Sequence, residues 1–285
     1  MSNLRTLRRR IRSVENSKKI FKAMEMVAAA KLRRAQARAL AARPYSVKIT
    51  EMLGKLAAAG DDLDHPLFKA REVKTTALVV VTADRGLCGA YNAGLIRAAE
   101  QRLRSEPSGS IQLVLVGKKA RDYFRRRKYP VLATHTPLPV DASLEYARKL
   151  TEELIELFVS GRVDRVELMF TQFISALRRK ILVETFVPVV ADPKAAGAAS
   201  GGTIFEPDAD RIVSELVPRY ASAKMYAAMA DALASEQGAR MIAMGAARKN
   251  SGELADLLTL QRNRLRQSVI TKELLEIVGG AEALK

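Results

Sequence analysis

The stretch TADRGLCG, residues 82 to 89, combines an acid, a base, two glycines and the only cysteine of the chain. A cysteine nucleophile needs a nearby base that turns the thiol into a thiolate. The chain has two histidines, His65 and His135, and nothing in their spacing pairs either one with Cys88. A thiol enzyme is therefore one hypothesis, but a small, half-buried residue in a tight turn explains Cys88 more simply.

Folding requirements explain the two glycines of this stretch but not its two charged residues. The two glycines fit a sharp turn from strand to helix that needs a positive φ. Folding gives no reason for the adjacent Asp84 and Arg85, which we predict to be an exposed pair. A contact surface built around a required bend is the simplest interpretation.

Two nucleotide-binding motifs are absent. A dinucleotide fold needs G-x-G-x-x-G at a strand-to-helix turn, and the chain has no such spacing. A phosphate loop needs G-x-x-x-x-G-K-[S/T]; Val116-Gly117-Lys118-Lys119 lacks the upstream glycine and the hydroxyl that binds magnesium. One cysteine forms no internal disulfide, and no Cys/His cluster has zinc-ligand spacing. We therefore expect no cofactor, no metal and no catalytic residue.

The net charge of +17 is concentrated near the N-terminus. Residues 1 to 48 hold fourteen Lys or Arg against Glu15 and Glu25, whereas residues 207 to 285 hold eleven basic residues against ten acids. Such a stripe attracts an acidic partner, whether nucleic acid, anionic lipid or an acidic protein surface. A solvated helix face is the alternative, but the imbalance is too local for it.

Two long helices are predicted at the ends of the chain. Apolar residues recur at helical spacing over residues 3 to 57, and a sustained seam of three-and-four spacing covers residues 207 to 278. Because a ~50-residue helix is far longer than usual, each needs a partner along its length. An antiparallel pair is the simple arrangement. Gly238, Gly245 and Gly252 lie seven apart in the seam, and we attribute them to close helix packing.

The middle of the chain is predicted to be an α/β body. Strands are expected at residues 76–82, 111–116, 131–134, 165–170 and 181–187, and helices at 91–104, 118–128 and 144–159. This alternation indicates a partly parallel sheet covered by helices. The predicted fold is therefore an α/β globular body, residues 61–206, with a long antiparallel two-helix coiled-coil shaft formed by residues 1–60 and 207–285.

Four motifs then carry a family resemblance. SVENSKKIFKAMEMVAAAKLRRAQ near the N-terminus, TADRGLCGAYN in the body, and SEQGARMIAMGAARKNSGELADLL and RQSVITKELLEIVGGAEAL near the C-terminus stand in the order found in one family. Together they resemble the gamma subunit of F-type rotary ATP synthases. Residues from about 105 to 205 resemble that family in layout more than in motif.

The resemblance implies a central rotor shaft. In the family, the coiled coil lies within a hexamer of alpha and beta subunits that carry the nucleotide sites, and the body sits with the epsilon subunit on the membrane-embedded c-ring. Proton-driven rotation of the ring turns the shaft and changes the affinity of each beta subunit, so ATP synthesis is coupled to proton flow. An acidic lever loop of the beta subunits would complement the basic N-terminal helix.

The resemblance also implies roles for individual residues. Partner contacts with the beta-subunit lever and catch are implied for Met24, Asp84, Arg85, Arg266, Gln267 and Thr271, the last three interacting functionally with the Met24 region. An apolar upper bearing would hold Leu274, Leu275, Ile277 and Val278. Docking on the ring is implied for Phe205 and Glu206, although a tyrosine is common at the position of Phe205.

The expected location follows from the same resemblance. We expect a peripheral protein on the cytoplasmic face of a bacterial plasma membrane, without a transmembrane segment of its own; a mature mitochondrial form is the less favoured origin. The single cysteine argues against the regulatory dithiol of plant chloroplast forms. The alternative function is a basic helical nucleic-acid-binding protein, but the basic face lacks interleaved aromatic residues and the chain has no tryptophan.

Overall fold

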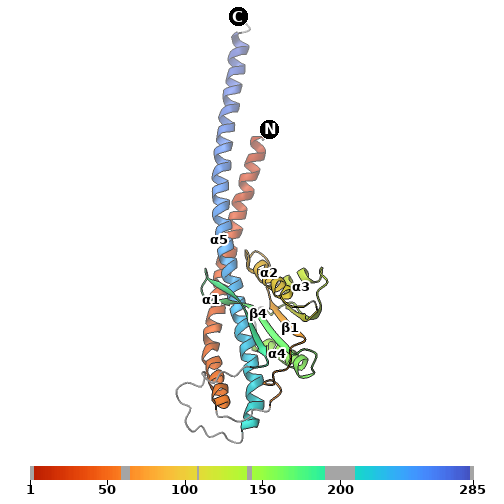
Figure 1. Ribbon diagram of the computed structural model, residues 1–285. Coiled ribbons are helices and arrows are strands. Elements are labelled where there is room, and N and C mark those ends of the chain that lie inside the picture. Colours follow the sequence, from red (N-terminus) through yellow and green to blue (C-terminus); the bar gives the residue numbers. More distant parts are fainter. Residues whose placement is uncertain (1–2, 59–64, 108, 140–142, 190–208, 283–285) are drawn as a thin grey trace. The chain divides into compact units, whose positions relative to one another are not determined.

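Figure 1 shows the computed structural model of the protein, which describes residues 3–58, 65–107, 109–139, 143–189 and 209–282. The described helices are α1 (Leu4–Ala58), α2 (Tyr91–Arg104), α3 (Lys118–Phe124), α4 (Leu144–Val159) and α5 (Ala209–Glu282). The described strands are β1 (Thr76–Val81), β2 (Ile111–Val116), β3 (Val131–His135), β4 (Arg165–Phe173) and β5 (Arg179–Val187).

These elements form two compact units. The paired-helix unit consists of Met1–Ala28 and Met241–Lys285, and the α/β unit consists of Ala29–Arg240. Both α1 and α5 contribute to each unit. The boundaries at residues 60 and 207 in the sequence-based prediction follow the ends of the long helices, and they stay a prediction.

One mixed sheet is the centre of the α/β unit. Its strand order is β3-β2-β1-β4-β5, with β5 antiparallel to β4 and every other pairing parallel. In β1, Thr76 lies opposite Ile111 of β2 and Arg165 of β4. All six residues of this central strand are buried, as its apolar, β-branched sequence predicts. The predicted partly parallel sheet is therefore confirmed.

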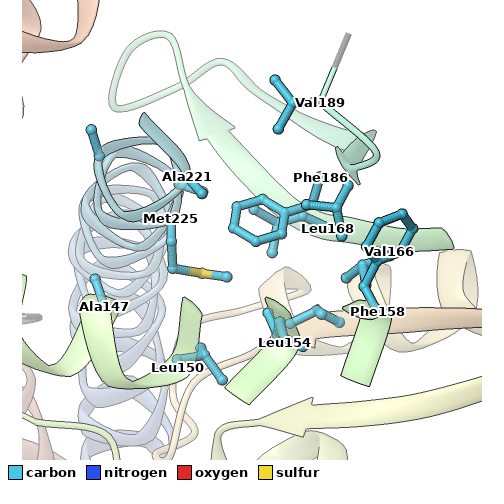
Figure 2. Close-up of a cluster of buried hydrophobic side chains, with 14 of the residues drawn as sticks. Ala147, Leu150, Leu154, Phe158, Val166, Leu168, Phe186, Val189, Ala221 and Met225 are labelled. Carbon is cyan, nitrogen blue, oxygen red and sulfur yellow. The ribbon is translucent and has the colours of Figure 1, made fainter. Parts of the chain in front are cut away.

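Helices cover both faces of the sheet. Because side chains alternate along a strand, Ala77 and Val79 pack with α4 and α5, whereas Leu78 and Val80 pack with α2 and α3. Figure 2 shows the first of these cores, with Phe158 of α4 and Met225 of α5 among its buried side chains. Full burial of one such side chain contributes about 1.5–3 kcal/mol.

The two long helices run antiparallel within the paired-helix unit. Arg248 Nε of α5 donates to Glu25 Oε2 of α1 at 2.8 Å, and Lys18 Nζ approaches Gly252. From the first contact to the second, the position on α1 shifts toward the N-terminus, from Glu25 to Lys18. The position on α5 shifts toward the C-terminus, so the two helices are antiparallel. This confirms the predicted fold: an antiparallel pair of terminal helices together with an α/β body.

Three predicted elements of the α/β body differ from the structure by two or more residues, and one of them is the strand predicted at 181–187, which begins at Arg179. The predicted helix at 118–128 is wrong beyond Phe124, where residues 125–128 form a turn. Pro130 disfavours helical backbone at Tyr129 and so limits how far the helix continues. Strand β4 continues three residues past its predicted end to Phe173, because residues 171–173 pair with β5 as one arm of a hairpin. Among the helices in the described ranges, none is both long and apolar enough to cross a membrane.

Candidate functional site

The segment after β1 is held against the segment after β2. Thr82 Oγ1 donates to Val116 O at 3.2 Å and accepts from the backbone N–H of Ala120 at 3.0 Å. Gly117 adopts a φ of 97°, and a Cβ there would lie 2.2 Å from Thr82 O. Only glycine allows the two segments to approach this closely. The stretch Val116-Gly117-Lys118-Lys119, which contains part of a phosphate-loop motif, therefore serves to pack these two segments together.

Asp84 corrects one expectation from the sequence. It is half-buried, and its Oδ1 accepts from the backbone N–H of Lys118 at 2.7 Å while its Oδ2 accepts from that of Leu138 at 2.6 Å. The prediction of an exposed pair is therefore wrong for Asp84, because the carboxylate joins three loops at one edge of the sheet. Arg85 is exposed, as predicted. A partner contact for either residue stays a prediction.

Cys88 is buried and hydrogen bonded. Asn92 Nδ2 donates to its sulfur at 3.0 Å, and Asn92 Oδ1 accepts from the backbone N–H of Ala83 at 3.0 Å. Burial raises the pKa of the Cys88 thiol, partly opposed by the charge of Arg240. A buried thiol with a raised pKa is a poor nucleophile. The two histidines have other neighbours: His65 Nδ1 accepts from Leu67 N–H, and His135 Nε2 lies 3.3 Å from Glu153 Oε2.

Leu87, at the tip of the same turn, has a φ of 62°. It is the one non-glycine residue with a positive φ in the described segments. The left-handed region costs an L-residue roughly 1–2 kcal/mol. The side chain is nevertheless exposed, so contacts within the chain do not account for a leucine at this position.

We expect Leu87→Gly to raise the free energy of unfolding by up to about 1 kcal/mol, because relief of the left-handed strain exceeds the added backbone entropy of glycine. Urea denaturation followed by circular dichroism measures the change. Leu177→Gly is the matched control, since Leu177 is also exposed at a turn but is not among the residues with positive φ. A lower stability for Leu87→Gly would contradict the strain argument.

The α/β unit contacts one stretch of α5 through hydrogen bonds. Tyr91 Oη donates to Ala232 O at 3.1 Å, and Ser235 Oγ donates to Thr171 O at 3.0 Å. Burial raises the pKa of Tyr91 far above its usual value, so the phenol stays a neutral donor. Gly238 lies beside the β4–β5 turn, and a Cβ there would lie 3.6 Å from Ala176 Cα, an ordinary van der Waals distance, so the neighbours of this glycine do not show the close helix packing predicted for it.

A buried ion pair completes this contact. Arg240 Nη2 donates to Glu236 Oε1 at 2.6 Å and to Gly86 O at 3.2 Å, and both charged side chains are nearly buried. Burial raises the pKa of Glu236, and the charge of Arg240 acts in the opposite direction. This pair was not among the residues predicted from the sequence. Its available signal was an acid and a base four residues apart within an otherwise apolar seam.

These contacts lie where α/β sheets commonly bind ligands. The chain runs from β1 to β2 and β3 on one side of the sheet and returns to β4 on the other side of β1. Ligands of open α/β sheets bind at the carboxyl ends of the strands beside such a reversal. In this protein Tyr91, which follows β1, and Thr171, near the end of β4, contact α5. Helix α5 therefore occupies the position at which such sheets commonly bind a ligand.

Two predicted glycine contacts involve charged side chains. A Cβ at Gly245 would lie 3.1 Å from Glu25 Oε1, and a Cβ at Gly252 would lie 3.2 Å from Lys18 Nζ. The prediction of close packing is confirmed for both positions. The glycines make room on α5 for the longer charged side chains of α1, and one of these, Glu25, is next to the half-buried Met24.

The structure does not bring Met24 into contact with Arg266. Gly245 of α5 lies opposite Glu25 of α1, and Gly252, seven residues later, lies opposite Lys18, seven residues earlier. Continuing this register places Arg266 opposite Leu4, about 20 residues or roughly 30 Å along the helix axis from Met24. A functional interaction between the two regions would therefore have to act without direct contact in this chain.

The last predicted contact residues are exposed on α5. Arg266, Gln267 and Thr271 all face solvent, and α5 continues past the first residues of α1 (Figure 1). The four predicted bearing residues are 57% to 69% exposed: Leu274, Leu275, Ile277 and Val278. Such an apolar surface is typical of a contact with another protein. Phe205 and Glu206 lie outside the described residues.

No metal-binding group is found among the residues that the structure describes: nowhere do three or more His, Cys, Asp or Glu lie together in a suitable arrangement. Hydrogen bonds and an ion pair of fixed geometry hold α5 on the α/β unit.

Comparison with known proteins gives consistent results over the whole chain. A family model described as ATP synthase matches residues 3–284. An ATP synthase gamma chain of Moorella thermoacetica is 47% identical over 285 residues, covering 100% of both chains. A second, from Synechococcus elongatus, is 42% identical over 316 residues, covering 100% of this chain and 99% of the other.

A solved structure has a similar fold. A chain of the Euglena gracilis mitochondrial ATP synthase, in a cryo-EM structure of its OSCP, F1 and c-ring in rotational state 3, superposes with a TM-score of 0.69. The match covers 99% of this chain and 94% of that chain at 21% identity. At this identity the comparison shows a shared fold.

Proposed function

Because the chain belongs to the family of ATP synthase gamma chains, we propose that it is the central rotor shaft of an F-type ATP synthase. In this role it transmits torque between a proton-driven c-ring and a catalytic hexamer of alpha and beta subunits. The chain itself is a non-catalytic subunit of the complex. The epsilon subunit is its proposed partner beside the c-ring, at the cytoplasmic face of a bacterial plasma membrane.

The observation that carries the proposal is the contact of the α/β unit with α5. Hydrogen bonds add a directional restraint to the apolar packing of a helix, because they have a preferred geometry whereas the hydrophobic effect is non-directional. Here hydrogen bonds from Tyr91, Ser235 and Arg240 attach α5 over the nine residues from Ala232 to Arg240, about 12 Å of helix. Since α5 continues unbroken to Glu282, a torque on its far part is resisted at these contacts.

The charge distribution supports the proposed partners. Helix α1 carries the largest excess of Lys and Arg in the chain. It also has exposed apolar side chains, Ile20, Met26 and Val27, and so needs partners in addition to α5. An acidic lever loop of the beta subunits would complement this surface. The alternative of a nucleic-acid-binding protein is not favoured, because full-length relatives at 42–47% identity are gamma chains.

The test is ATP hydrolysis by a complex assembled from this chain with alpha and beta subunits of the same source. We expect turnover to depend on the chain. We further expect Met24→Lys to assemble, and, in membrane vesicles that hold the complete complex with its c-ring, to couple ATP hydrolysis poorly to proton transport, because it adds a cation beside the Glu25–Arg248 ion pair and the proposed lever.

Met24→Leu is the matched control, because it keeps the size and apolar character of the side chain, and it should behave as the unsubstituted chain does. Failure of the unsubstituted chain to assemble, together with retardation of duplex DNA at moderate salt, would contradict the proposal and favour the nucleic-acid alternative.

A further inference from the structure

A histidine holds the turn that precedes β1 by accepting a hydrogen bond. His65 Nδ1 accepts from the backbone N–H of Leu67 at 3.2 Å, and the N–H of Phe68 donates to His65 O at 3.0 Å. A neutral imidazole has one nitrogen that donates and one that accepts, whereas the imidazolium ion has two donors and no acceptor. The hydrogen bond from Leu67 therefore requires a neutral His65 whose proton is on Nε2.

This turn joins the two connections between the sheet and the long helices. Leu67 is almost fully buried in the core that also contains Val189 (Figure 2), and Leu67 O accepts from the N–H of Val189 at 2.7 Å. Leu67 belongs to the connection from α1 to β1, whereas Val189 belongs to the connection from β5 to α5. The position of His65 therefore affects both connections at once.

The surroundings of His65 disfavour a positive charge on its ring. The ring is part-buried and lies edge-on to the ring of Phe68, with 6.2 Å between the centroids. Burial lowers the pKa of His65 below its ordinary value of 6.5. Protonation in the folded turn therefore has two unfavourable effects: it places a charge in a desolvated position, and it leaves the N–H of Leu67 without its acceptor.

Nearby charged groups do not change this assignment. The first charged residues after the turn are Lys69, Arg71 and Glu72, and Arg71 donates to the last turn of α4. On the helices of the same core, ion pairs join Lys48 to Glu51 of α1 and Glu215 to Arg219 of α5. None of these groups contributes to the lowered pKa of His65. Asp64, the residue before His65, lies outside the described residues.

We propose that His65 is a proton-operated latch, which holds Leu67 and Val189 together while it is neutral and releases them when it is protonated. The inference goes beyond the proposed function, because a rotor shaft does not require it. It would make the connections between the sheet and the two long helices depend on the acidity of the surrounding solution.

The direction of the pH dependence follows from proton linkage. The open form binds a proton more readily than the latched form, so the latch is fully formed above pH 6.5 and is lost as the pH falls below that value. From pH 7.5 to pH 5.5 the opening equilibrium can increase by at most about tenfold, because roughly ten of every eleven open molecules carry the proton at the lower pH.

The first test is hydrogen exchange of the full chain near pH 7.5 and near pH 5.5, read by mass spectrometry in peptides that contain Leu67 or Val189. After correction for the pH dependence of chemical exchange, we expect both amides to lose protection about three- to tenfold at the lower pH. A loss smaller than about threefold would overturn the proposal.

Two substitutions of His65 separate the latch from general acid sensitivity. Asparagine also accepts from the N–H two residues on and does not titrate, so His65→Asn should keep the protection at both pH values. His65→Ala has no acceptor and should show the low protection at both. His135→Gln removes the other histidine of the chain and should leave the pH dependence unchanged. A pH dependence that persists in His65→Asn would refute the latch.

The second test is a direct titration of the two histidines by NMR, with His135→Gln used to assign the signals. We expect the His65 ring to titrate below pH 6.5, as its burial implies. Titration at or above pH 6.5 would contradict the proposal, because the open form would then have no advantage in binding the proton. None of these outcomes bears on the rotor function, which assembly and ATP turnover test separately.

Discussion

Arg240→Ala is expected to lower the free energy of unfolding by about 3–5 kcal/mol, the usual penalty for leaving one charge of a buried pair without its partner. Glu236 is almost as buried as Arg240, and the arginine is its closest cation at 2.6 Å. The substitution also removes the hydrogen bond to Gly86 O, so the turn after β1 loses its contact with α5. Urea denaturation measures the loss.

The penalty should depend on pH. Burial already raises the pKa of Glu236 above its ordinary value, and removing Arg240 takes away the main opposing charge, so the pKa rises further. A group whose pKa is higher in the folded state favours folding below its unfolded pKa and loses that contribution as pH rises through the folded pKa. The loss in Arg240→Ala should therefore be larger near pH 8 than near pH 5.

The double variant Glu236→Gln, Arg240→Ala is the control. Because glutamine carries no charge at either pH, the pH dependence should disappear and part of the stability should return. An equal penalty for Arg240→Ala at both pH values would contradict the assignment of a buried, ionised Glu236.

Gly117→Ala is expected to cost more than about 3 kcal/mol, because two separate penalties add. The backbone at φ 97° and ψ 145° is a conformation that alanine adopts only under strain. In addition, the new Cβ would lie 2.2 Å from Thr82 O, and a backbone atom has no flexible end that could move away. Because the chain lacks tryptophan, circular dichroism during urea denaturation is the suitable measurement.

Gly109→Ala separates the two penalties. Gly109 also has a positive φ, of 91°, but no atom lies within 4 Å of its would-be Cβ. Its substitution should cost only the conformational strain, about 1 kcal/mol. A similar cost for both alanine variants would show that the segments after β1 and β2 separate easily, against the close approach seen at Thr82.

Local sequence patterns were sufficient for most of the elements. Strand β1 follows from a short run of apolar and β-branched residues, and α4 follows from an apolar stripe at helical spacing. One error, at the end of α3, overlooked a local signal, Pro130, and another arose where a distant partner decides the structure. Strand β4 extends to Phe173 because β5 pairs with those residues, and the sequence of residues 171–173 alone does not indicate it.

The candidate site was predicted less completely. Asp84 was recognised as notable, but its partners Lys118 and Leu138 lie 34 and 54 residues away, so sequence spacing could not identify its structural role. The residues that attach α5 to the α/β unit were missed for the same reason: Tyr91 and Ala232 are 141 residues apart. Contacts with other subunits rest on the resemblance and stay predictions.

The ion pair between Glu25 and Arg248 has a consequence for how the chain is made. The two residues are 223 positions apart, and a ribosome adds residues from the N-terminus onward. The first helix is therefore synthesised long before its partner exists, with Leu7, Ile11 and Ala28 lacking the surface that later buries them. A segment with exposed apolar residues is prone to aggregate in that interval. The five arginines between Arg5 and Arg12 keep the same segment strongly charged, and this repulsion between nascent chains favours solubility until synthesis is complete.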